Sequence, residues 1–285
     1  MIDWQDLRYF LAVARLGSLT AAAAELGVDH ATVGRRVARL EVAAGLTLIV
    51  RSPRATRLTE AGLALAQAAR GVEDQSQAVI RHLRGHSSQA SGTVAISALP
   101  GLAAYLIAPS LAAFQALHPQ IRLSLSATSQ VASLERGEAD IAIGLVRPQA
   151  AGRVVKRVGT LAFAFYATDQ FQQREARDWT FIGFESSLDH LPQQAWLRAF
   201  AGHRPITLRS NDVITQLQAA LGGAGVALLP CLLGQAHAEL VRLPGQPPLP
   251  GRPLWMSVHP DLRRSPGVRA TMEHLARLCD GLPTG

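Results

Sequence analysis

The stretch DHATVGRRVARLEVAA, residues 29–44, determines how the rest of the chain is interpreted. Val33, Val37 and Leu40 recur at the i, i+4 and i+7 spacing of an amphipathic helix. Asp29 stands at the N-cap position, and Gly45 follows the predicted end of the helix. The rest of the helix surface carries three arginines: Arg35, Arg36 and Arg39. Such a helix either binds a polyanion or merely exposes a solvated basic face.

The positive charge of the chain is concentrated around this helix. The 285 residues carry 28 basic and 21 acidic side chains, a net charge of +7. Six arginines and one acid, Glu41, lie between Arg35 and Arg57, so these 23 residues hold +5 and the remainder of the chain only +2. A basic segment this focused favours a polyanionic partner over general basicity.

Two further helices are predicted before the basic one. Residues 3–15 have apolar side chains at helical spacing, and residues 19–26 are rich in alanine, whose small side chain lets helices cross closely. Gly27 permits the left-handed turn that a short connection needs. A helix, a tight turn and a basic helix in this order form the helix-turn-helix arrangement, in which the last helix enters the major groove.

A wing is predicted directly after the basic helix. Residues 46–50 form a short apolar run, and Arg51, Arg54 and Arg57 follow in a loop. These side chains could reach phosphates or the minor groove. The alternative is a surface loop that only carries charge.

A long helix is predicted from residue 59 to about residue 84, because apolar residues alternate there at spacings of three and four. This period is typical of a coiled-coil seam, so we expect the helix to dimerise the chain, although Gly62 and Ser76 weaken the seam. The residues expected in the interface are Leu65, Ala69, Val72, Val79 and Leu83. The Ser- and Gly-rich segment GHSSQASG, residues 85–92, marks a domain boundary.

Beyond residue 92, predicted strands and helices alternate, which indicates an α/β fold with parallel sheets and helices on both faces. Ligands in such folds bind at the carboxyl ends of strands. Two of the candidate residues have an alternative: Ser129 could equally cap the following helix, and Arg147 could simply lie on the rim of the binding site. The candidate ligand-binding residues are Leu99, Pro100, Gly101, Thr128, Ser129, Gln130, Leu145, Val146, Arg147, Ser210 and Asn211.

Neither a catalytic site nor a metal or cofactor site is predicted. The chain has no G-x-S-x-G segment, and its two cysteines are far apart, which fits a reducing compartment better than a disulfide framework. The N-terminus MIDWQDL lacks the apolar region of a signal peptide. Since no apolar run approaches the ~20 residues of a membrane span, we expect a cytoplasmic protein without a membrane partner.

Several stretches resemble LysR-type transcriptional regulators. Those that carry the resemblance most specifically are FLAVARLGSLTAAAAELGV (residues 10–28), HATVGRRVARLE (30–41) and LIVRSPRATRLTEAG (48–62). The second half agrees more loosely, in GTVAISA (92–98), GEADIAIG (137–144), GGAGVALLP (222–230) and RRSPGVRA (263–270).

The resemblance implies three parts: a winged helix-turn-helix domain over residues 1–58, a dimerising linker helix and hinge over 59–91, and an effector-binding domain over 92–285. The last would resemble periplasmic solute-binding proteins, with one α/β subdomain over about 92–161 and 260–285 and another over about 162–259. It further implies a transcriptional regulator that is not an enzyme, binds double-stranded promoter DNA as a homodimer or homotetramer, and responds to a small-molecule metabolite.

Eight residues are expected to contact DNA: His30, Thr32, Arg35, Arg36, Arg39, Arg51, Arg54 and Arg57. For Arg36, guanine readout and phosphate binding remain equally open, and Arg39 could instead pair with an acid. Gly34 stands where many family members have a serine, which removes one possible contact.

The first strand of the second half leads into Leu99-Pro100-Gly101, where many family members have a hydroxyl residue that meets a carboxylate. This departure weakens the case for an anionic effector. A second hypothesis therefore remains open, a constitutive architectural DNA-binding protein whose effector pocket no longer functions.

Overall fold

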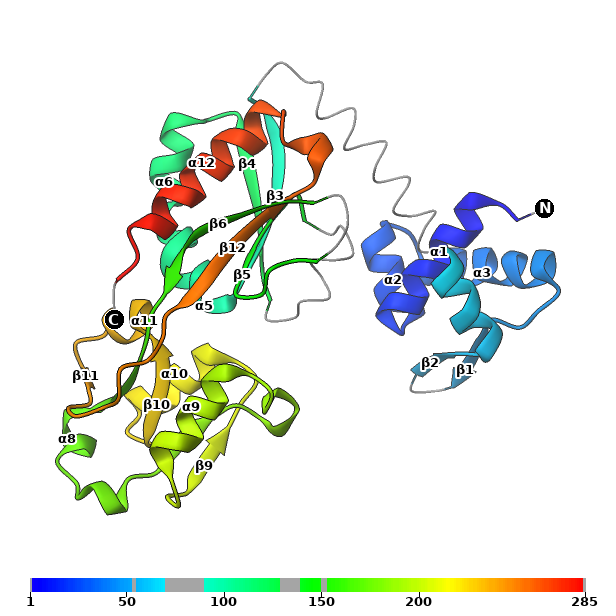
Figure 1. Ribbon diagram of the computed structural model, residues 1–285. Coiled ribbons are helices and arrows are strands. Elements are labelled where there is room, and N and C mark those ends of the chain that lie inside the picture. The colour runs from blue at the N-terminus through cyan, green and yellow to red at the C-terminus, as the bar shows by residue number, and fades with distance from the viewer. Residues whose placement is uncertain (1, 53–54, 70–89, 129–138, 150–152, 284–285) are drawn as a thin grey trace. The chain divides into compact units, whose positions relative to one another are not determined.

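The structure is a computed structural model that describes residues 2–52, 55–69, 90–128, 139–149 and 153–283 (Figure 1). The chain divides into two compact units, Met1–Ile80 and Arg81–Gly285.

The first unit has the helices and the hairpin that the sequence predicts. Its elements are α1 (Trp4–Leu16), α2 (Leu19–Leu26), α3 (His30–Ala44), β1 (Ile49–Ser52), β2 (Ala55–Leu58) and a further helix over residues 60–69. The side chains of Asp3, Ser18 and Asp29 accept hydrogen bonds from the first turns of α1, α2 and α3. Strands β1 and β2 pair antiparallel, so the winged helix-turn-helix architecture is confirmed.

The apolar stripe of α3 lies at the centre of the first unit. Val33, Val37 and Leu40 are fully buried, beside Phe10 of α1. Glu41, the single acid of the basic segment, accepts hydrogen bonds at Oε1 from the backbone N–H groups of Leu48 (2.8 Å) and Ile49 (3.1 Å). These bonds fasten the start of the hairpin to α3, so the position of the hairpin depends on that of α3.

The helix over residues 60–69 packs on its own unit through residues that the expected coiled-coil seam includes. Ala69 is buried in the core of the first unit, and Leu65 packs against that core. A Cβ at Gly62 would lie 3.0 Å from the carbonyl carbon of Leu48 and nearer still to its oxygen, so Gly62 is needed for this close approach. Val72, Val79 and Leu83 lie outside the described residues.

The second unit contains two five-stranded sheets. The first has the order β4-β3-β5-β12-β6, from β3 (Gly92–Ala98), β4 (Ile121–Ala127), β5 (Ile141–Gly144), β6 (Val154–Leu161) and β12 (Arg252–Val258). The second has the order β11-β7-β10-β8-β9, from β7 (Phe163–Thr168), β8 (Phe181–Gly183), β9 (Ile206–Arg209), β10 (Val226–Pro230) and β11 (Leu240–Arg242).

Both sheets are mixed, although parallel sheets were expected. Strand β3 runs parallel to β4 and β5, but β12 is antiparallel to β5 and β6. Likewise, β10 is parallel to β8 and antiparallel to β7. The expected subdomain boundary at residue 259 is therefore wrong, because residues 252–258 return to the first sheet. The chain passes from β6 to β7 at Ala162.

The helices cover these sheets (Figure 1). The longer ones are a continuous helix from Pro100 to Leu117 (α5 Pro100–Leu102, a π-helical turn Ala103–Ile107 and α6 Ala108–Leu117), α9 (Pro192–Ala201), α10 (Val213–Leu221) and α12 (Pro266–Asp280). Short elements that the sequence did not reveal are α8 (Asp169–Gln172), α11 (Cys231–Gly234), strand β11 and 3-10 turns at Ala176–Asp178, Ser186–Leu188 and Pro260–Leu262.

By length and composition alone, the helix Pro100–Leu117 would suffice to cross a membrane, although no such run was expected from the sequence. Core helices of water-soluble proteins meet the same criterion. Here one side of the helix is buried in the core of the second unit, through Leu102, Ile107 and Phe114.

Gly234 of α11 lies against the ring of Tyr166, and this contact generates a test of the second unit's core. A Cβ at Gly234 would lie 2.5 Å from Cε2 and 2.6 Å from Cε1 of the buried Tyr166. We expect Gly234→Ala to lower the free energy of unfolding by about 1–3 kcal/mol, because the ring has to move within a filled core. Urea denaturation followed by circular dichroism measures this change.

The matched control is Gly222→Ala, at the end of α10. Its nearest neighbours would lie 3.5 Å and 3.6 Å away, and its φ of −74° suits alanine. We expect this variant to stay within about 1 kcal/mol of the wild type. Equal stability of the two variants would contradict the Tyr166 contact.

Candidate functional site

The first turn of α3 presents an ordered set of polar side chains. The carboxylate of Asp29 accepts from the backbone N–H of Thr32 at 2.7 Å and from its hydroxyl at 2.8 Å. These hydrogen bonds lower the pKa of Asp29. The Thr32 hydroxyl in turn accepts a bond from Nη2 of Arg35 at 2.9 Å. Thr32 therefore orients the exposed Arg35 guanidinium, and the exposed His30 stands at the start of the same helix.

Arg36 and Arg39 both form ion pairs with Asp6 of α1. Nη1 of Arg36 lies 3.0 Å from Oδ1 of Asp6, and Nε of Arg39 lies 3.4 Å from Oδ2 of the same residue. The hydrogen bond to Asp6 raises the pKa of Arg36, whose guanidinium also lies 5.7 Å from the centre of the Tyr9 ring. Because the Asp6 side chain is only 4% exposed, these bonds hold α3 against α1.

Arg36 is therefore half-buried in an ion pair and does not project freely from the helix. Arg39 adopts the acid-pairing alternative, although its side chain remains 62% exposed. On the hairpin, Arg57 of β2 is exposed and lies opposite Val50. The side chain of Arg51 and all of Arg54 lie outside the described residues.

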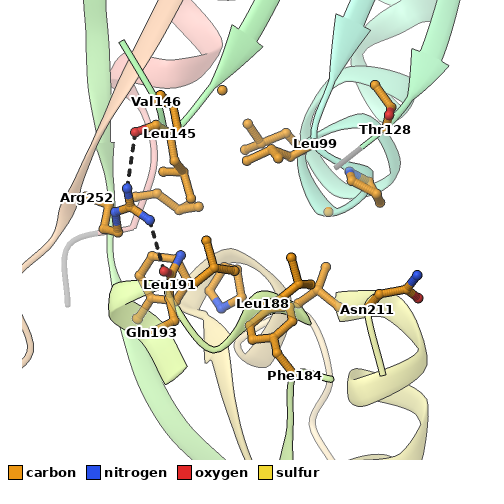
Figure 2. A pocket seen from close by; sticks show the side chains of 18 of the residues that line it. Leu99, Thr128, Leu145, Val146, Phe184, Leu188, Leu191, Gln193, Asn211 and Arg252 are labelled. Carbon is orange, nitrogen blue, oxygen red and sulfur yellow. Dashed lines mark hydrogen bonds between the residues drawn. The ribbon is translucent and has the colours of Figure 1, made fainter. Parts of the chain in front are cut away.

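A cavity of about 540 Å³ opens in the second unit at the ends of its strands (Figure 2). The carboxyl ends of β3 and β5 supply one wall, and the segment after β8 supplies much of another. Seven of the residues expected from the sequence line it: Leu99, Pro100, Gly101, Thr128, Leu145, Val146 and Asn211.

Two expected residues lie elsewhere. The guanidinium of Arg147 lies 5.4 Å from the centre of the Trp255 ring and does not line the cavity. The hydroxyl of Ser210 accepts a bond from the backbone N–H of Asp212 at 3.1 Å, at the start of α10, so Ser210 has a local structural role. Ser129 and Gln130 lie outside the described residues.

Most of the cavity wall is apolar. Leu99, Leu145, Leu188 and Leu191 face the space between the walls, together with Phe184 (Figure 2). Such a lining suits the carbon skeleton of a small molecule, whereas a few polar groups orient it.

The sequence did not indicate the main polar groups of this cavity. Arg252 donates from Nη1 to Oε1 of Gln193 at 2.9 Å and from Nη2 to the carbonyl oxygen of Leu145 at 3.3 Å (Figure 2). Burial lowers the pKa of Arg252. The hydroxyl of Ser97, also in the lining, is buried without a hydrogen-bond partner in the part of the chain that the structure describes.

The sequence alone does not indicate Arg252, because this residue lies in the turn-rich segment 248–253 and not at the carboxyl end of a predicted strand. Its place opposite Leu161 of β6 depends on the pairing of β12, which alternation of strands and helices cannot predict. Across the described ranges, no group of three or more His, Cys, Asp or Glu residues is placed to hold a metal ion. The apolar wall of the cavity and its few polar groups are suited to binding a small molecule.

Two family models match the chain. The model for the bacterial regulatory helix-turn-helix protein, lysR family, matches residues 4–63, and the model for the LysR substrate binding domain matches residues 87–280. Similar proteins include the Mau operon transcriptional activator of Paracoccus denitrificans, 27% identical over 97% of this chain and 96% of that protein. The glycine cleavage system transcriptional activator of Escherichia coli K12 is 28% identical over 83% of this chain and 80% of that protein.

The fold is also similar to solved structures. One is the full-length Vibrio cholerae virulence activator AphB, with a TM-score of 0.64, 18% identity and coverage of 96% of this chain and 98% of that one. Another is full-length CbnR complexed with its target DNA, with a TM-score of 0.63, 18% identity and coverage of 97% and 100%. With a DNA-binding helix-turn-helix in its first unit and an effector-binding domain in its second, this chain belongs to the LysR family of transcriptional regulators.

Proposed function

We propose that this regulator binds its operator through Arg35 and the wing, and that a small metabolite in the cavity of the second unit controls that binding. The observation that carries the proposal is the open, largely apolar cavity of about 540 Å³ at the strand ends. We further propose that the protein acts in the cytoplasm, with residues 1–58 as DNA-binding domain, 59–91 as linker, and 92–285 as effector-binding domain.

On the DNA side, we assign different tasks to the arginines of α3. Arg35, exposed and oriented by Thr32, would contact a base edge or a phosphate, with His30 beside it. Arg36 and Arg39 would set the angle of the helix through Asp6. Arg51, Arg54 and Arg57 of the wing would contact phosphates or the minor groove. CbnR, which has a similar fold, has been solved in complex with its target DNA, and this supports DNA binding as the role of such a chain.

The assembly would be a homodimer, and two dimers would form a tetramer. Two recognition helices are needed to bind two half-sites, which is how helix-turn-helix proteins obtain specificity. Since Leu65 and Ala69 face the core of their own unit, we assign the pairing surface to the opposite side of the helix over residues 60–69. Leu63 lies there with 52% of its surface exposed, next to the exposed Ala64.

The alternative function, constitutive DNA binding with a non-functional pocket, receives less support. Side chains would be expected to fill a pocket that no longer binds a ligand, since protein interiors are close-packed. Here the cavity has the size and apolar wall of a small-molecule site and retains a hydroxyl and a guanidinium.

Affinity for operator DNA should fall steeply with salt. A dimer would display four arginines from each protomer, Arg35, Arg51, Arg54 and Arg57. With a contribution of about −0.9 for each phosphate neutralised, the slope of log affinity against log salt concentration should lie between about −4 and −7. Fluorescence anisotropy with a labelled operator measures this slope, and a slope near zero would contradict the DNA-binding assignment.

Arg35→Ala should weaken operator binding and reduce discrimination against mutated operators by about 1–3 kcal/mol if Arg35 contacts a base. If Arg35 contacts only a phosphate, binding to all sequences should weaken equally. The control is Arg177→Ala, which removes an exposed arginine from the second unit. Unchanged operator binding by the Arg35 variant would refute the role of Arg35.

A ligand that binds the cavity should raise the melting temperature of the protein and change its affinity for the operator. A ligand at 100 times its Kd should stabilise the native state by about 2.7 kcal/mol. Leu188→Trp, which places a bulky ring in the cavity, should abolish both effects, because Leu188 lines it. The control is Leu117→Trp, at a position that is 68% exposed. If no member of a metabolite panel changes either property, the constitutive alternative is favoured.

A further inference from the structure

The cavity has one strongly cationic group among the described residues that line it, the guanidinium of Arg252. Figure 2 shows Arg252 on one side of the cavity, with Thr128 and Asn211 on the other and apolar side chains between them. A charge at one end of an apolar space is an asymmetric binding feature, because it can orient a ligand that has one polar end.

The hydrogen bonds of Arg252 leave its charge uncompensated. Its acceptors are the side-chain amide of Gln193 and the backbone carbonyl of Leu145, and both are neutral. Over the described ranges, no carboxylate lies within ion-pair distance of Arg252. Glu185 also lines the cavity, but its carboxylate accepts a hydrogen bond from the Ser187 hydroxyl at 2.7 Å.

This arrangement is costly without a ligand. An arginine in a protein remains protonated, so partial burial leaves a cation in a poorly solvated place. Burial lowers the pKa of Arg252 in agreement with that cost. The planar guanidinium can bind both oxygens of a carboxylate at once, and such charge-assisted bonds are stronger than neutral ones.

A second candidate for an anion site in this cavity, the start of the helix at Pro100, is weaker. The helix that begins at Pro100 also borders the cavity, but Pro100 has no N–H to donate, residues 99–101 have no polar side chain, and the remaining backbone N–H groups of the first turn carry no full charge. Ser97 offers a buried hydroxyl that lacks a partner within the described ranges, and this neutral group suits a hydrogen bond to a ligand atom but does not supply a counter-charge.

We propose that the cavity binds a small organic monoanion with an apolar body, and that the carboxylate of this ligand pairs with Arg252. The inference rests on the proposed effector function and specifies the chemical class of the effector. It also assigns Arg252 as the residue that distinguishes an acid from its neutral counterpart. The departure at residues 99–101 therefore moves the anion site to the opposite wall and does not abolish it.

The test compares matched pairs of acids and primary amides, 4-phenylbutanoate with 4-phenylbutanamide and octanoate with octanamide. Isothermal titration calorimetry on the full-length protein gives Kd for each compound. We expect the wild type to bind at least one acid about tenfold or more tightly than its amide, since hydrogen bonds to charged groups exceed neutral ones by about that factor. Arg252→Gln should remove this preference, because glutamine retains a donor but has no charge.

The control is Arg147→Gln, which removes a guanidinium stacked on Trp255 outside the cavity and should retain the preference of the wild type. Equal binding of acids and amides by the wild type, or an acid preference that survives in Arg252→Gln, would overturn the inference. So would binding of neither series.

The proposed function is judged separately. A metabolite-panel compound that changes operator affinity, with that effect abolished in Leu188→Trp, would uphold effector control even if every carboxylate failed. If carboxylates bind with the expected preference but leave operator affinity unchanged, the ligand class stands and effector control by these ligands fails.

Discussion

The return of β12 to the first sheet is the constraint on which the effector-binding domain depends. This strand inserts between β5 and β6 and pairs antiparallel with both, after the chain has built the second sheet. Its first residue, Arg252, thereby arrives beside the end of β5 and bonds the carbonyl of Leu145 as well as Gln193 of α9. One strand pairing therefore both closes the first sheet and places the cation in the cavity.

In the first unit, contacts between helices decide the roles of the arginines. The arginines of residues 35–57 do not have the same role, because the almost fully buried Asp6 of α1 forms ion pairs with Arg36 and Arg39. Glu41 similarly holds the hairpin through two backbone amides. Asp6 thus fixes Arg36 and Arg39 against α1 and leaves Arg35 exposed, whereas Glu41 fixes the hairpin. Net charge alone overstates the number of side chains available to DNA.

The sequence was informative wherever a local pattern is sufficient. The 3.6-residue period, the N-caps and the glycines at the ends of α1, α2 and α3 are local features, and the helices follow them. The rule that ligands bind at strand ends also located Leu99, Thr128, Leu145 and Asn211 correctly in one cavity. It failed for Arg147 and Ser210, since adjacency to a strand end does not specify the direction of a side chain.

By itself, then, the sequence determined the family, the helix-turn-helix and the alternating α/β character, because each is encoded in residues close together in the chain. Only the tertiary structure decided which arginines remain exposed, which face of the helix over residues 60–69 is buried, and which charged residues line the cavity. Asp6 and Arg36 are 30 residues apart, and Arg252 and Leu145 are 107 apart. Contacts over such separations leave no periodic trace in a single sequence, because they depend on how strands and helices pair and not on the local spacing of residues.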